Sequence, residues 1–130
     1  MSGRALEPER HAGVFAFVCV DERADRSGLD AVATMREREG VTLIVPEEQA
    51  RARGLDVLFR CAWITLRLPS ALDATGLTAV FAAALAADGI ACNVVAGAHH
   101  DHLFVPVARA DEAVAILRGL RFGDGGRAVD

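Results

Sequence analysis

The chain of 130 residues contains no lysine, no tyrosine and a single tryptophan, and all of its 14 basic residues are arginine. The absence of lysine excludes a Schiff-base lysine and a phosphate-loop lysine, because both functions need the lysine amino group. No apolar run approaches the roughly 18 residues of a membrane span, and the polar start of the chain does not resemble a secretory signal. We therefore expect a cytoplasmic protein that has no membrane partner.

Acidic residues outnumber basic ones by 18 to 14, which gives a formal net charge of -4. Such a charge repels nucleic acid, so a nucleic-acid partner is not expected. Hydrophobic residues make up 52% of the chain and charged residues 25%, a balance typical of a globular protein rather than a disordered chain. Three cysteines, widely spaced within apolar stretches, indicate buried reduced thiols rather than a disulfide or a metal knuckle: Cys19, Cys61, Cys92.

The first half of the chain is expected to consist mainly of strands. Residues 1–12 are polar, so an irregular lead-in is predicted there. The apolar segments 13–20 and 41–45 are strands by their valine, isoleucine and phenylalanine content. The segment 31–39, AVATMRERE, fits a helix or a strand, and the Glu-Gly turn that follows favours a strand. A proline, two acidic residues, two arginines and a final glycine then mark a short helix at 46–54.

The second half alternates strands and helices. Residues 62–68 alternate between apolar and polar, as a strand with one face in the core does. A helix follows, because large apolar residues recur at every fourth position: Leu77, Phe81, Leu85. Strands at 90–96 and 103–107 flank a tight turn, and a last helix has a small or aliphatic face: Ala110, Ala113, Val114, Leu117. A weak strand near 120–122 and a flexible glycine-rich tail at 123–130 complete the prediction.

This order of elements predicts an α+β fold. The second half gives β, α, β, β, α and a weak last strand, which is the ferredoxin-like βαββαβ order. The first half gives β, β, β, α, which is the same order with the loop at 21–29 in place of the first helix. We therefore expect two ferredoxin-like units in tandem, a degenerate one at 13–59 and a complete one at 60–122.

The stretch SALDATGLTAVFAAALAADGIACNVVAGAHHDHLFVP, residues 70–106, resembles the C-terminal half of the small stand-alone tandem ACT-domain proteins of bacteria. Their pattern is close to S-x-L-x-A-x-G-L-T-A, G-I-x-x-N-V-x-A-G and H-D-H-x-F-V. FAFVCV and MREREGVTLIVPEEQARARGL are similar to the first half of the same family. The resemblance implies tandem ACT units that bind amino acids or similar small effectors at interfaces between units, and that regulate metabolic enzymes.

Two positions depart from the family pattern. The family more often has aromatic residues after the position of Gly97, where this chain has Ala98 and His99. It also often has histidine or a similar polar residue where Pro69 stands. Ligand contacts made by those positions are therefore not carried over to this chain.

The loop at 69–76 is the first candidate for a binding site. It lies between a strand and a helix start, where free backbone N–H groups and the helix dipole stabilise a ligand carboxylate. Gly76 permits close approach, and Ser70 or Asp73 has the chemistry to contact an amino group or a hydroxyl. The alternative is structural: Asp73 or Thr75 caps the helix, and Gly76 allows tight packing. The family pattern adds two further positions to the candidate site: Leu72, Leu77.

Asn93 is a polar residue on an otherwise apolar strand, and it falls in the N-V motif of the family. The resemblance implies that this strand faces the ligand or a partner subunit, and a side-chain amide suits the head group of an amino acid. The alternative is a buried asparagine that fixes the strand register or satisfies a neighbouring loop. Trp63 projects from the face of its strand opposite Ile64 and is expected to pack in the core or an interface.

The segment HHDH, residues 99–102, has three interpretations. His100 and His102 share one face of a strand and would bind zinc or another divalent metal if a third ligand came from elsewhere. A structural turn, in which Asp101 accepts backbone N–H groups and orients an imidazole, is the simpler interpretation. A contact of His100 and His102 with a ligand or an interface is the third.

The sequence as a whole favours a noncatalytic regulatory protein. No nucleophile elbow, paired acidic motif or oxyanion loop is recognisable, and no cofactor is expected. The expected partners are a small effector, in the first place an amino acid, and a second copy of the chain in a homodimer. Binding would favour one arrangement of the units. A metal-dependent enzyme or sensor built on the HHDH segment and a pure oligomerisation module are the alternatives.

Overall fold

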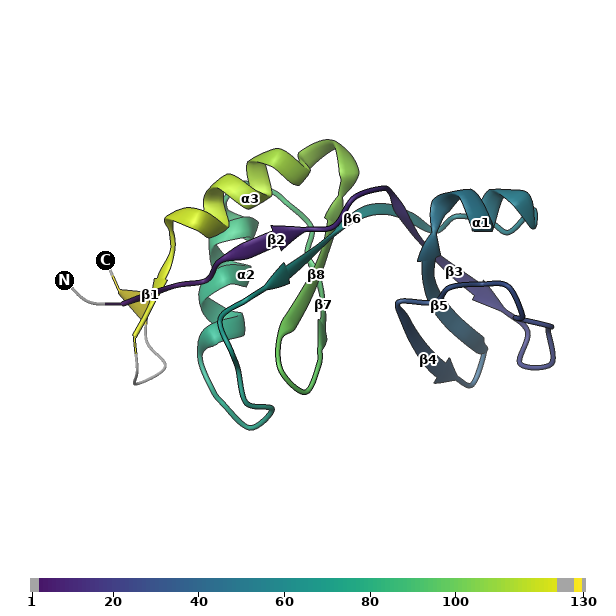
Figure 1. Ribbon diagram of the computed structural model, residues 1–130, viewed down its shortest axis with the longest axis horizontal. Helices are drawn as coiled ribbons and strands as arrows, with labels where there is room; N and C mark the ends of the chain where they lie inside the picture. Colours follow the sequence, from purple (N-terminus) through teal and green to yellow (C-terminus); the bar gives the residue numbers. More distant parts are fainter. Residues whose placement is uncertain (1–2, 124–127, 130) are drawn as a thin grey trace. The chain divides into compact units, whose positions relative to one another are not determined.

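Figure 1 shows the computed structural model of the chain, in which residues 3–123 and 128–129 are described. The chain divides into two compact units according to its internal contacts. The small unit comprises residues 12–62, and the large unit comprises residues 1–11 together with residues 63–130. The chain therefore begins in the large unit, passes through the small unit and returns.

The small unit has the ferredoxin-like strand order with its first helix absent. Its elements are β3, β4, β5, α1 and the start of β6: Phe15–Val20, Ala33–Glu37, Gly40–Pro46, Glu47–Ala52 and Phe59–Leu66. The strands pair in the order β4-β5-β3-β6, in which the first strand lies between the third and the fourth. A loop at residues 21–32 leads from β3 to β4. The prediction of a degenerate unit is thus confirmed, as is the choice of a strand for the ambiguous segment.

Alternate side chains of β3 and β5 form the core of the small unit. They lie on one buried face and pack with one alanine of α1: Ala16, Val18, Val41, Leu43, Val45 and Ala50. Glu47 opens α1 and pairs with Arg51 at 3.1 Å, as the helix pattern predicted. Cys19 is exposed, so its predicted burial is wrong, because it follows Val18 in the strand and therefore faces outward.

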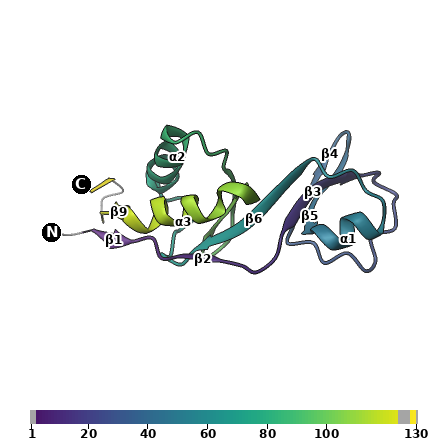
Figure 2. The ribbon, with the colours of Figure 1, turned by 90° about the horizontal axis from the view of Figure 1, so that it is seen from above.

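The large unit contains two helices and the strands that they cover. After β6 come α2, β7, β8, the short 3-10 helix η1 and α3: Leu77–Ala87, Asn93–Ala96, Asp101–Pro106, Val107–Arg109 and Ala110–Gly119. Its strands follow the order β2-β6-β8-β7. Helix α3 packs against α2, β2 and β8, and α2 and α3 lie next to each other in Figure 2.

The core of the large unit lies between these helices and β6 and β8. The apolar faces predicted for both helices are buried: Leu77, Phe81, Leu85, Ala110, Ala113, Val114 and Leu117. The strands contribute alternate buried side chains to this core: Ile64, Leu66, Leu103 and Val105. Phe104 lies on the other face of β8, where its ring stacks with that of Trp63. In the part of the chain that the structure describes, no helix is long and apolar enough to cross a membrane.

The N-terminal segment is not an irregular lead-in, so the expectation for residues 1–12 is wrong. Residues Arg4–Ala5 form β1 and residues Pro8–Arg10 form β2. Strand β2 pairs antiparallel with β6, with Pro8 opposite Leu66 and Arg10 opposite Ile64. It occupies the place of the fourth strand of a βαββαβ unit. The segment looked irregular because an edge strand of three residues has too few buried positions to show an apolar pattern.

The end of the chain also differs from its prediction. A strand does form near residues 120–122, but this strand, β9 (Arg121–Phe122), pairs with β1 and with β10 (Ala128–Val129) in a separate small sheet. The predicted flexible tail at 123–130 therefore includes a strand, while residues 124–127 and 130 lie outside the described residues. The expected boundary between residues 59 and 60 falls inside β6, whose residues 59–61 pair with β3 and whose residues 64–66 pair with β2.

Candidate functional site

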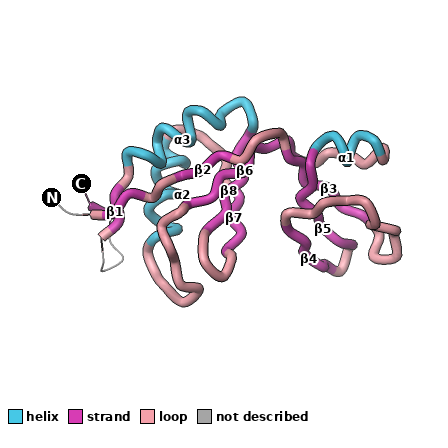
Figure 3. Tube along the Cα trace, in the orientation of Figure 1, coloured by secondary structure: helices cyan, strands magenta, loops and turns pink. Residues whose placement is uncertain are grey.

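The connection between β6 and α2 and the β7–β8 turn lie at the same end of the large unit (Figure 3). The N–H of Ser70 donates to the carbonyl of His99 at 3.3 Å, which joins the two segments. Between them lies a cavity of about 160 Å³, here named the loop pocket. It is lined by both segments: Ser70, Ala71, Leu72, Ala74, Gly76, Leu77, Thr78, Ala96, Gly97 and Asp101.

Four of the predicted site residues line the loop pocket: Ser70, Leu72, Gly76 and Leu77. Four others are not among its lining residues: Asp73, Asn93, His100 and His102. Asp73 is exposed, and Asn93 is an exposed residue of β7 that stands opposite Phe104 of β8. The alternative of Asn93 as a buried residue is therefore wrong. It failed because β7 is the last strand in the sheet order and has an open edge.

Gly76 determines how the loop enters α2. It is the N-cap residue with φ of 98°, a conformation that glycine adopts without strain, and no side chain caps the helix. The predicted capping by Asp73 or Thr75 is therefore wrong. The first intrahelical bond joins the N–H of Val80 to the carbonyl of Gly76 at 3.1 Å. The N–H groups before Val80, those of Leu77 and Thr78 included, lack an intrahelical acceptor and stand at the positive end of the helix dipole.

Asp101 is the acidic side chain of the loop pocket. It opens β8 opposite Ala96 and is only 7% exposed. Burial raises the pKa of its carboxyl group, and the neighbouring His102 opposes this rise. The sequence interpretation gave Asp101 a role in the turn and missed it as a site residue. A signal was present, because a carboxylate at the start of a strand of core residues is costly to bury without a partner.

The imidazole of His102 lies beside the pocket, behind the turn. Its Nδ1 accepts a hydrogen bond from Trp63 Nε1 at 3.1 Å and lies 3.0 Å from Thr65 Oγ1. Burial lowers the pKa of His102, as do His100 and His11, while Asp101 raises it. The Nδ1 of His100 is buried and has no hydrogen-bond partner among the described residues. No set of three or more potential metal ligands is clustered in the described ranges 3–123 and 128–129.

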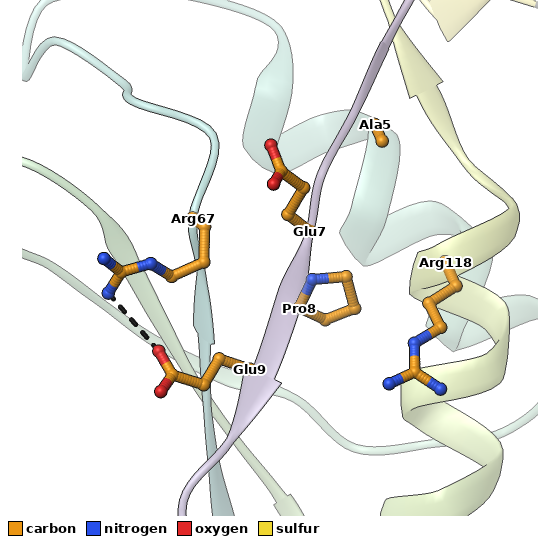
Figure 4. Close-up of a pocket in the computed structure, with 6 residues that line it drawn as sticks. All are labelled: Ala5, Glu7, Pro8, Glu9, Arg67 and Arg118. Carbon is orange, nitrogen blue, oxygen red and sulfur yellow. Dashed lines mark hydrogen bonds and ion pairs between the residues drawn. The ribbon is translucent and has the colours of Figure 1, made fainter.

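A second and larger cavity is an open groove of about 560 Å³, shown in Figure 4. Its walls come from the N-terminal segment, the residue after β6 and α3: Ala5, Glu7, Pro8, Glu9, Arg67 and Arg118. Arg67 pairs with Glu9 at 3.3 Å, and both side chains are 53% exposed. Water and salt screen exposed charges of this kind, so they hold a ligand weakly. The smaller loop pocket, with its buried carboxylate, is therefore the better candidate site.

Two ACT domain profiles match the chain, one over residues 4–62 and the other over residues 58–119. The two matches overlap at residues 58–62, where β6 begins. No protein with a curated description matches the chain.

Solved structures resemble the chain over most of its length. A Vibrio cholerae protein of unknown function, described as a possible transport protein, is 41% identical, with a TM-score of 0.83 and coverage of 88% of each chain. An Agrobacterium tumefaciens protein is 16% identical, with a TM-score of 0.73 over 95% of this chain and 91% of its own. Aspartokinase alpha and beta subunits share the fold at 9% identity, with a TM-score of 0.60 over 88% and 96%. The chain therefore belongs to the ACT-domain family, as a small protein with two ACT units in tandem.

Proposed function

We propose that the protein is a noncatalytic regulator that binds a small amino-acid-like effector in the loop pocket. ACT domains indicate a regulatory ligand-binding role, and the fold is that of two ACT units. One observation carries the proposal: the same cavity is lined by the first residues of α2, whose N–H groups lack intrahelical acceptors, and by the buried Asp101. These two groups match the two charges of a zwitterion.

The carboxylate of the effector is assigned to the α2 side of the pocket. Leu77 and Thr78 line it, and α2 is long enough, at 11 residues, to present a helix dipole. Gly76 has no side chain to block this approach. The hydroxyl of Ser70, which also lines the pocket, is a further donor for the same group.

The amino group of the effector is assigned to Asp101. An ammonium ion in the pocket would supply the partner that a buried carboxylate needs, and the two charges would interact in a region partly shielded from water. The volume of about 160 Å³ corresponds to about five waters of ~30 Å³ each. The proposal therefore favours a small amino acid over an aromatic one.

Strand β7 supplies the proposed homodimer contact. It is the last strand in the order β2-β6-β8-β7, so no strand among the described residues pairs with its other side in this sheet. Val95 of β7 and Leu72 of the adjacent loop pocket are exposed apolar side chains. Pairing of two copies along β7 would cover Val95 and place the exposed Asn93 at the interface. Effector binding would then favour one arrangement of the dimer over another.

We further propose that the first ACT unit runs from β3 into β6, and that the second runs from β6 to α3 and is completed by β2. The overlap of the two profile matches at the start of β6 supports this division. A cytoplasmic location remains a prediction from the sequence.

A thermal-shift panel of the twenty amino acids tests the proposal. A ligand at a hundredfold excess over its dissociation constant stabilises the folded state by about 2.7 kcal/mol, which is a measurable shift. We expect a shift with one or more small amino acids, and we expect Asp101→Asn to remove it. Asp73→Asn is the matched control, because it makes the same chemical change at an exposed residue outside the pocket lining.

Two results would contradict the proposal. If no amino acid shifts the melting temperature of the wild type, the proposal fails, and a pure oligomerisation module becomes the favoured interpretation. A shift that survives in Asp101→Asn and in Gly76→Val, a variant that fills the approach to α2, would place the ligand elsewhere. Circular dichroism of each variant establishes that it is folded before its result is interpreted.

A further inference from the structure

A network of four side chains lies behind the β7–β8 turn, within the large unit. His102 of β8 contacts Trp63 and Thr65 of β6, and Thr65 Oγ1 lies 2.7 Å from Nε2 of His11. The ring of His11 stacks on Trp63, with a distance of 3.5 Å between ring centroids. Thr65 is only 2% exposed, so the two imidazoles meet at a buried hydroxyl.

The hydrogen bonds define the protonation state of His102. An indole N–H can only donate, so Nδ1 of His102 must accept from Trp63 and carries no proton. The ring is therefore neutral, with its proton on Nε2. Protonation of the ring would place a hydrogen on Nδ1, facing the N–H of Trp63. Two donors cannot share a hydrogen bond, so the ring would have to rotate or move away from Trp63, whereas the hydroxyl of Thr65 can accept a hydrogen bond from the new N–H.

The charged groups around the two imidazoles oppose protonation on balance. His11 faces His102 from the segment after β2, and His100 faces it from the β7–β8 turn, while Asp101 is the one neighbour that favours the cation. Trp63 and Thr65, from β6, carry no charge. Burial also lowers the pKa of His11, Arg67 lowers it further, and Glu9 raises it. Protonation of the network therefore takes place below the pH at which an unperturbed histidine titrates.

The network also touches the wall of the loop pocket. A side chain at Gly97 would begin 3.2 Å from Nε2 of His102, so the imidazole lies directly against this glycine. Gly97 and Asp101 line the pocket, and the N–H of Gly97 closes the turn on the carbonyl of His100 at 2.9 Å. A movement of the His102 ring would therefore displace Gly97, which forms part of the pocket wall.

We infer that His102 is a proton sensor that regulates the loop pocket: its protonation breaks the hydrogen bond with Trp63, displaces the Gly97–Asp101 wall and weakens binding of the effector. The part of this inference that concerns affinity rests on the proposed function. The part that concerns the pocket wall does not, because it is a property of the protein without ligand. By linkage, an effector that binds the neutral form shifts protonation of His102 to lower pH.

Nuclear magnetic resonance of the ligand-free protein tests the proton sensor. Trp63 is the only tryptophan, so the protein gives one indole N–H signal. We expect this signal and the Gly97 amide signal to move with one common midpoint, below about 6.5, as the pH falls from 8 to 5. In His102→Gln both signals should lose that transition, whereas His99→Gln, which changes an exposed histidine of the same turn, should keep it.

Two results would overturn the proton sensor. The first is an indole signal that stays in place from pH 8 to 5, or moves equally in His102→Gln. The second is a Gly97 amide signal that does not follow the indole signal. In His11→Gln the transition of His102 should persist at a higher pH, because a neighbouring cation is removed.

Calorimetric titration with glycine, L-alanine and L-serine at pH 7.5 and pH 5.5 tests the effect on affinity. We expect at least about fivefold weaker binding at pH 5.5, and a smaller change in His102→Gln. Equal affinity at both pH values overturns the regulation by His102. If none of the three binds at either pH, the proposal of a small amino acid as effector fails, while the indole and Gly97 signals still decide whether His102 senses protons.

Discussion

Leu68 donates its backbone N–H to the carbonyl of Leu6 at 3.2 Å, and both side chains are buried, although 62 positions separate them in the chain. This contact extends the pairing of β2 with β6 by two residues beyond the strand ends. The N-terminal segment is therefore an integral part of the large unit. Its removal would expose the edge of β6 and the core beneath it.

Leu6→Ala should destabilise the protein by roughly 2–5 kcal/mol, because Leu6 is fully buried and the substitution leaves a cavity. Urea unfolding followed by circular dichroism measures the loss. The matched control is Leu72→Ala, which should change stability by no more than about 0.5 kcal/mol, since Leu72 is 71% exposed. Equal effects of the two substitutions would contradict the integral role of the N-terminal segment.

Asp101→Asn should raise the melting temperature at pH 7 while it removes effector binding. The pKa of Asp101 is raised on folding, so the folded state binds the proton more tightly and stability falls as the pH rises through the raised pKa. At pH 7 the ionised carboxylate therefore lowers the stability of the folded, ligand-free protein. Calorimetric scans at pH 7 and at pH 3, where both states hold the proton, should show a gain only at pH 7. A lower melting temperature at pH 7 would mean that Asp101 has a stabilising partner.

His102→Gln should reduce the loss of stability that the wild type undergoes between pH 7.5 and pH 5.5. The pKa of His102 is lowered on folding, so the unfolded chain binds the proton more tightly in this range. The contribution of the neutral ring to stability is fully present above about 6.5 and is lost as the pH falls through the lowered pKa. Melting temperatures across this range give the slope, and His99→Gln should keep the slope of the wild type. An unchanged slope in His102→Gln would contradict this assignment.

Val95→Arg should convert the proposed dimer to a monomer. Pairing of β7 with its symmetry mate would bring two arginines together, and like charges at such a contact repel. Sedimentation velocity at several protein concentrations measures the oligomeric state. Met35→Arg is the control, because Met35 is 64% exposed on β4, at the edge of the small unit. A dimer that persists in Val95→Arg and dissociates in Met35→Arg would assign the contact to β4.

The elements with several buried positions could be predicted from the sequence. Leu77, Phe81 and Leu85 repeat at helical spacing, and all three lie in the core of the large unit. The loop that replaces a helix after β3 could also be predicted, since its charged residues have no apolar face. Strands β1 and β2 could not, because they are short strands whose partners lie far away in the chain: β1 pairs with β9 and β2 pairs with β6. Local patterns carry no information on such distant pairing.

The candidate site could be predicted in part. The loop with Ser70 and Gly76 has a recognisable position before a helix, and the structure brings both residues to the loop pocket. Asp101 was overlooked because the two histidines beside it suggested a turn or a metal. The network that joins His11 to His102 depends on the return of the N-terminal segment to β6, which no local pattern reveals.

Strand β6 contributes a paired segment to each of the two units. Its residues 59–61 are paired with β3 and its residues 64–66 with β2, and side chains along a strand alternate between two faces. Within each unit, loss of one residue from its part of β6 would move the residues beyond the deletion to the opposite face of the strand. In the large unit, a deletion at Ile64 would take Thr65 away from the face that carries His11 and His102. The paired parts of β6 should therefore tolerate exchanges of similar side chains, but neither an insertion nor a deletion.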